Sequence, residues 1–143
     1  MIGVVVVAGA LVAVGFGYTI ARAESKAGNG PAVLISAPSY AWLPNGQFNA
    51  VTFVVQSSAT LAGTFSNTHG LVLYLMNTTQ FYSLTRTNVP SSYNWTSGSI
   101  PSLVRYNLSI AVSSGTWNLV FFNPSTVVPS GVDFWSPVTE TLG

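Results

Sequence analysis

YNLSIAVSSGTWNLVFFN, residues 106–123, contains two runs of alternating apolar and polar side chains around a Ser-Ser-Gly turn. A two-residue period is the pattern of a strand with one buried face, and glycine beside serine is typical of a turn. The stretch therefore predicts a β-hairpin with one inward face. The residues of that face are Tyr106, Leu108, Ile110 and Val112 in the first run, and Trp117, Leu119 and Phe121 in the second.

The chain between residue 31 and this stretch repeats the pattern less regularly, as does its C-terminal end. Short runs of β-branched and aromatic residues alternate with turn-forming clusters at a spacing of roughly ten residues. Several such strands predict an all-β sandwich of the immunoglobulin-like kind. The predicted strands are residues 32–36, 50–56, 71–77, 106–112, 116–123 and 132–141.

Four tryptophans are available to fill this sandwich. A large aromatic side chain buries about 150–250 Å², so we expect the tryptophans to supply much of the bulk of the core. The alternative is an exposed platform on which sugars stack. The four residues are Trp42, Trp95, Trp117 and Trp135.

An apolar segment precedes the predicted sandwich. Residues 2–21, IGVVVVAGALVAVGFGYTIA, carry no charge and no proline. As a helix rising about 1.5 Å per residue, the segment would span roughly 30 Å, the thickness of a bilayer core. Small residues at every fourth position would let neighbouring helices approach closely. This row consists of Gly9, Ala13, Gly17 and Ala21.

Three fates are open for this segment. A small-x-small motif at residues 21–23 suits cleavage of a secretory signal, although no basic region precedes the apolar run. A permanent anchor would place Arg22 and Lys26 on the cytoplasmic side, together with the sandwich. Removal of a basic leader before Met1 resolves that conflict, and we favour it.

The organisation of the chain resembles an archaeal type IV pilin. The resemblance rests on the apolar run from Met1 to Ala21, the charged segment RAESK at residues 22–26 and the remainder rich in strands, serine and threonine. Bacterial pilins usually carry a glutamate at the fifth mature position, where this chain has Val5. The resemblance implies a cleaved leader, an assembly helix and a surface domain. We place that helix at residues 1–27 and the sandwich at residues 28–143, an α+β arrangement.

Charged side chains are too few for most catalytic sites. They make up 5% of the chain, against about 25% in a typical soluble protein. The absence of cysteine excludes disulfides and thiolate chemistry, and a net charge of +1 excludes a basic stripe for nucleic acid. We therefore expect no enzyme activity, no cofactor and no metal site.

Two weak motifs have simpler explanations. His69 and Asp133 could join a serine in a triad, but no nucleophile-elbow sequence lies near His69, which we assign to a surface turn. Residues 15–17, Gly-Phe-Gly, resemble the start of a dinucleotide-binding loop, but Ile20 replaces its third glycine and no strand precedes it. We assign these glycines to the apolar helix.

Three asparagines lie in N-x-S/T sequons and are candidates for N-glycosylation. Attached sugars would hydrate an extracellular surface that has few charges. Asn107 falls on the outward face of its predicted strand, and Asn94 lies in a polar loop. The three candidates are Asn77, Asn94 and Asn107.

Together these features predict a structural subunit of an extracellular filament. The resemblance implies a homopolymer on the cell surface that serves adhesion or motility. The subunit would be inserted in the membrane before pilus assembly machinery adds it. Two alternatives remain, namely a membrane-anchored surface domain that binds carbohydrate or a surface partner, and a thread whose subunits donate the strand-like residues 4–7 to one another.

Overall fold

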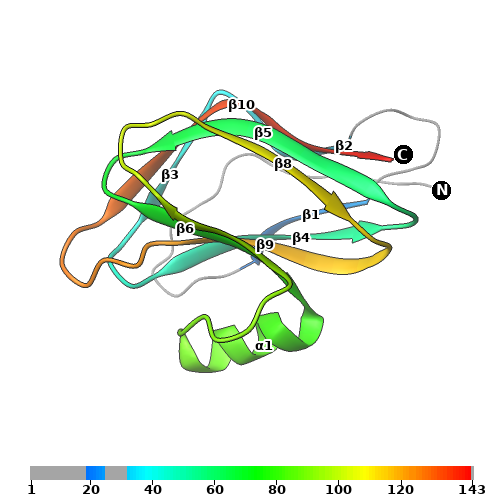
Figure 1. Cartoon of the computed structure of the whole chain (residues 1–143), viewed down its shortest axis with the longest axis horizontal. Helices are drawn as coiled ribbons and strands as arrows, with labels where there is room; N and C mark the ends of the chain where they lie inside the picture. The colour runs from blue at the N-terminus through cyan, green and yellow to red at the C-terminus, as the bar shows by residue number, and fades with distance from the viewer. Residues whose placement is uncertain (1–18, 25–31, 143) are drawn as a thin grey trace.

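Two β-sheets pack face to face with one short helix outside them, in the computed structural model shown in Figure 1. The structure describes residues 19–24 and 32–142. The described part is mostly β, which confirms the predicted sandwich. Its elements are β1 (Thr19–Glu24), β2 (Ala32–Ile35), β3 (Ser39–Leu43), β4 (Phe48–Val55), β5 (Ala59–Asn67), β6 (Leu71–Asn77), α1 (Thr78–Thr87), β7 (Trp95–Ile100), β8 (Tyr106–Val112), β9 (Gly115–Phe122) and β10 (Ser130–Leu142).

Each sheet has five strands, which are antiparallel except for β1. Sheet A has the order β1-β4-β9-β6-β7, and β1 runs parallel to β4. Sheet B has the order β2-β10-β5-β8. Strand β3 also pairs with β10, so β2 and β3 follow one another along one edge of this long strand.

Aromatic rings join the two sheets in the centre of the core. The Phe65 ring on β5 lies 5.7 Å from Phe121 on β9 and 5.8 Å from Phe134 on β10, measured between ring centroids. The Tyr106 ring approaches Phe65 to 5.4 Å. The three phenylalanines are at most 2% exposed. We call these four side chains the aromatic junction, since Phe121 belongs to sheet A and the others to sheet B.

Helix α1 covers part of the outer face of sheet A. Phe81 and Leu84 on the helix pack with Phe48 on β4 in a second apolar cluster. Asn77 caps the helix, because its side chain accepts a hydrogen bond from Gln80 N (2.8 Å) and Gln80 Oε1 accepts one from Asn77 N. This reciprocal pair is a capping box. The sequence analysis did not predict this helix.

The predicted hairpin at residues 106–123 is wrong, although both of its strands form. Strand β8 pairs with β5 in sheet B, whereas β9 lies between β4 and β6 in sheet A. The turn between β8 and β9 therefore carries the chain from one sheet to the other. Alternation determines which face of a strand is buried but not its partner, and two inward faces can meet across a sandwich as well as side by side.

The six predicted strands are confirmed as β2, β4, β6, β8, β9 and β10, with small differences at their ends. Strands β3, β5 and β7 were not predicted. Strand β5 alternates small residues with Leu61 and Phe65, which gives a weak pattern. Its Gly63 is required because a methyl group there would lie 2.8 Å from Val138 Cγ2.

The N-terminal segment is only partly described. Residues 19–24 form β1 in place of the predicted end of the helix. The edge of β4 offers backbone N–H and C=O groups that a strand can pair with, and Thr19 and Ile20 are β-branched residues that suit a strand. The remaining residues of the predicted helix lie outside the described residues, and so does the domain boundary at 27/28.

We expect replacement of Asn49 by valine to raise the free energy of unfolding by about 1–2 kcal/mol. Asn49 lies on β4 and is fully buried, and neither its Oδ1 nor its Nδ2 has a hydrogen-bond partner among the residues that the structure describes. Valine removes both unpaired groups and suits a strand. Chemical unfolding of the two full-length chains would measure the difference.

Asn118 provides the matched control for this prediction. It is also buried, but its Oδ1 accepts a hydrogen bond from Thr52 Oγ1 (2.7 Å) and its Nδ2 donates one to the carbonyl oxygen of Met76 (3.4 Å). Asn118→Val should therefore destabilise the protein. A loss of stability in Asn49→Val similar to that in Asn118→Val would contradict the prediction.

Candidate functional site

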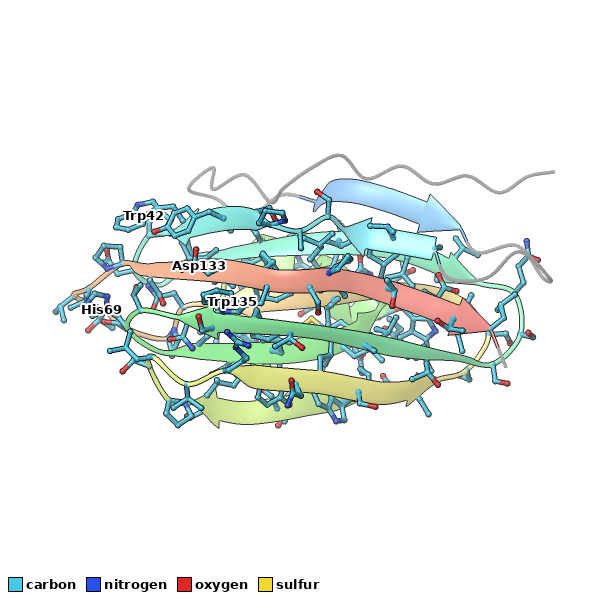
Figure 2. The ribbon with its side chains drawn as sticks, turned by 90° about the horizontal axis from the view of Figure 1, so that it is seen from above. Trp42, His69, Asp133 and Trp135 are labelled. Atoms are coloured by element: carbon cyan, nitrogen blue, oxygen red, sulfur yellow. The ribbon has the colours of Figure 1, made fainter. Side chains whose placement is uncertain are left out.

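Exposed aromatic side chains gather on the outer surface of sheet B. Tyr40 and Trp42 on β3 are 46% and 47% exposed, and Trp135 on β10 is 55% exposed. Asp133 shares the outward side of β10 with Trp135, and Figure 2 shows both near Trp42 on the neighbouring strand β3. We call Tyr40, Trp42, Asp133, Trp135 and the adjoining Arg105 the aromatic face.

Two interactions hold the indole of Trp135 in place. Its Nε1 donates a hydrogen bond to Ser66 Oγ on β5 (3.0 Å). The guanidinium carbon of Arg105 lies 4.4 Å from the ring centroid, within the range of a cation–π interaction. Stacking uses the flat side of the guanidinium and leaves its N–H groups at the edge, able to donate hydrogen bonds.

Tyr40 is held against the backbone of the neighbouring strand. A methyl group at Gly131 would overlap the hydroxyl and the ring of Tyr40. The missing side chain of Gly131 therefore makes room for Tyr40 beside β10. Gly131 is also the direct cross-strand partner of Trp42, and Tyr40 that of Asp133. The pairing of β3 with β10 therefore brings Tyr40, Trp42 and Asp133 together.

Four loops meet at the end of the sandwich next to this face. Asn123 is fully buried, and its Nδ2 donates hydrogen bonds to the carbonyl oxygens of Leu43 (3.1 Å) and Val128 (2.9 Å). The buried Asn67 donates one to the carbonyl oxygen of Pro101 (3.3 Å). These asparagines fix the loops to one another. The loops span residues 44–47, 68–70, 101–105 and 123–129.

This loop end exposes apolar side chains. Leu103 is 79% exposed and Val127 78%. Leu103 also has φ 63°, a left-handed conformation that is uncommon for a bulky residue. Its backbone N–H donates to the carbonyl oxygen of Asn67 (2.7 Å), which holds it there. Neither burial nor backbone preference accounts for a leucine at this position.

The tryptophans divide between the core and the surface. Trp117 is buried and Trp95 packs against the core, as predicted. For Trp42 and Trp135 the prediction of burial is wrong. The phase of the strand explains this, because Val132 and Phe134 face inward on β10 and therefore turn Trp135 outward. The alternation along β10 thus contains the information that Trp135 is exposed.

The three candidate glycosylation sites do not belong to the aromatic face. Asn77 caps α1 and is half-buried, whereas Asn94 is exposed before β7. Asn107 is exposed on β8, and its Oδ1 accepts a hydrogen bond from Thr64 Oγ1 (3.1 Å). Glycosylation of the three asparagines stays a prediction.

The proposed packing row falls almost entirely outside the described residues. Gly9, Ala13 and Gly17 lie there, and Ala21 is placed in β1 opposite Val51.

The described residues do not gather into a metal centre, and the two residues considered for a triad lie on different elements. His69 is exposed in a loop, and its Nδ1 lies 3.1 Å from Thr68 Oγ1, whereas Asp133 lies on the sheet (Figure 2). Within residues 19–24 and 32–142, no cluster of three acidic or histidine side chains could hold a metal ion. The same residues include no helix long and apolar enough to span a bilayer.

The described fold defines the chain as a β-sandwich protein. No family model and no curated protein matches its sequence.

Proposed function

We propose that this chain is a structural subunit of an extracellular filament of the type IV pilus kind. The observation that carries the proposal is the uncharged segment 2–21 ahead of a sandwich with a core of its own. The apolar clusters of the described side chains draw on residues 34–142. These clusters form from described side chains alone, and in this proposal the apolar segment 2–21 packs against other subunits.

In this proposal residues 1–27 form the assembly helix, and residues 28–143 form an immunoglobulin-like surface domain. Helices from neighbouring subunits would bury their apolar surface together, which contributes about 25 cal/mol per Å². Residues 19–24 would exchange their pairing with β4 for contacts with those helices. A head-to-tail contact repeated by helical symmetry gives an open polymer. Before assembly the subunit would be held in the membrane by the same segment, and pilus assembly machinery would add it to the filament.

The layout of the sandwich supports this arrangement. Ala32, which follows the N-terminal segment, pairs with Glu140 near the C-terminal end of β10. The loop end lies at the other end of that strand, where Ser130 pairs with Leu43. Once residues 19–24 have left β4, the segment would join the domain at Ala32, at the end of the sandwich opposite the exposed apolar loops. A filament with buried helices would present these surfaces outward, as adhesion requires.

Electron cryomicroscopy of filaments sheared from cells that produce this chain would test the proposal. Mass spectrometry of the same filaments would identify the subunit. A central bundle of helices from residues 1–27 would support the pilus. Filaments joined by inserted strands would establish the thread instead, and a chain found only in the membrane fraction would establish the anchored domain.

We expect Gly17→Leu to abolish filaments while the sandwich stays folded. Gly17 would lie one turn from Ala13 in the row of small residues, and a leucine there would hold neighbouring helices apart. Filament yield by electron microscopy and unfolding of the purified chain would give the two readouts. Gly15→Leu is the matched control, since residues two apart point to different sides of a helix. Normal filaments from Gly17→Leu would refute the row.

A further inference from the structure

The aromatic face exposes large apolar ring surfaces to water. A large aromatic side chain can bury about 150–250 Å², yet Tyr40, Trp42 and Trp135 are each about half exposed. They lie together on neighbouring strands, and contiguous exposed apolar patches mark binding surfaces. The face is therefore a candidate for contact with a ligand.

Two of the three rings of this face are held in place by neighbouring residues. Trp135 is held by Ser66 and Arg105, and Tyr40 lies against Gly131. Rigid aromatic side chains bind at a low cost in conformational entropy. The arrangement suits a ligand that stacks flat on rings at set positions.

Polar groups beside the rings indicate the chemistry of that ligand. Asp133 offers hydrogen-bond acceptors, and the edge of the Arg105 guanidinium offers donors. Their charges are opposite, so the face complements a neutral ligand with many hydroxyl groups, each of which both donates and accepts. A bilayer surface would instead favour a continuous apolar face bordered by several basic residues.

We propose that the aromatic face binds a neutral polysaccharide. Sugar rings have an apolar C–H side, which would stack on Trp42 and Tyr40, while their hydroxyl groups would hydrogen-bond to Asp133 and Arg105. This site is independent of how the subunit assembles, because all of its residues belong to the described sandwich. Binding can therefore fail without affecting the filament proposal, and the filament proposal can fail without affecting binding.

Affinity electrophoresis of the full chain in mild detergent would test this site. The chain would be produced without N-glycosylation, so that no sugar at Asn107 covers the face. The probes are mannan, dextran and a β-1,3-glucan cast in the gel, with acidic alginate for comparison. We expect retardation by at least one neutral polymer. No retardation by any of the three, or stronger retardation by alginate, would overturn the proposal.

Two variants and a control locate the binding. Trp42→Ala should weaken retardation at least about tenfold, which is the loss of one stacking ring. Gly131→Ala should also weaken it by displacing Tyr40. The control is Tyr82→Ala. Tyr82 on α1 is 63% exposed and stacks with Arg86, as Trp135 stacks with Arg105, but it lies over sheet A. Equal retardation of Trp42→Ala and the unmodified chain would overturn the proposal, as would loss of binding in Tyr82→Ala.

Discussion

Replacement of Phe65 by alanine is expected to lower the free energy of unfolding by about 4 kcal/mol. Phe65 is fully buried and lies within 6 Å of three other rings of the aromatic junction. The truncation removes the ring that contacts both sheets, and rigid strands on either side prevent the cavity from closing. Chemical unfolding followed by tryptophan fluorescence would measure the loss, since Trp117 is buried between the same sheets.

Phe81→Ala is the control for this prediction. Phe81 packs edge-on against Phe48, with 6.0 Å between the ring centroids, but it is half-buried at the border of the second apolar cluster, beneath α1. Its removal leaves a site that water can enter, so the loss should be about half of that for Phe65 or less. Equal losses in the two variants would mean that the junction does not hold the sheets together.

Asn123→Ala is expected to lower the free energy of unfolding by about 3 kcal/mol, because one buried and two partly buried hydrogen bonds are lost at once. The side chain donates to the carbonyl oxygens of Leu43 and Val128, and its Oδ1 accepts from Ser125 N at 3.0 Å. Alanine would remove all three of these hydrogen bonds. Thermal unfolding would report the loss, and faster proteolysis within residues 123–129 would show that the loop has loosened.

Asn45 offers a matched comparison, because its side chain joins the loops 44–47 and 123–129. Its Nδ2 also donates to a loop carbonyl, that of Thr126 at 3.1 Å, but this bond is exposed. Water can replace an exposed hydrogen bond, so Asn45→Ala should change stability by less than about 0.5 kcal/mol. If both variants lost the same stability, burial would not be the reason for the effect at Asn123.

Strand positions were predictable from the sequence because burial of one face imposes a period of two. The inward residues of β8 and β9, such as Leu108 and Leu119, were correctly identified on this basis. Their partners were not, since Ser113 and Ser114 can turn the chain within a sheet or between sheets. The local sequence shows which face of a strand is buried, whereas the strand with which it pairs depends on the whole chain.

The missed elements have weaker local signals. Strand β7 is polar and contains Gly98 with φ 69°, and β5 relies on small residues. Helix α1 contains many threonines, which are weak helix formers. The spacing of Asn77 and Gln80 was its one clear signal, as a capping box, but Asn77 had been considered only as a sequon.

The candidate site was harder to predict than the fold. Tryptophan is a residue type that suits a core, which favoured burial of Trp42 and Trp135. Their positions in the alternation of β3 and β10, however, place both on the outer face. Arg105 lies outside any predicted strand, so nothing in its neighbourhood indicated that it stacks on Trp135. A ligand-binding face of this kind becomes visible only when three strands and a loop are placed together.

The pairing of β10 determines the order in which the domain can fold. This last strand pairs with β2, β3 and β5, and within residues 19–24 and 32–142 only β6 and β7 pair as consecutive strands. Contacts between distant parts of a chain are slow to form, because a long loop must close before any of them is made. Sheet B cannot assemble until residues 130–142 have been synthesised. The sandwich is thus expected to fold as one unit once residues 130–142 have emerged from the ribosome, rather than strand by strand as the chain is made.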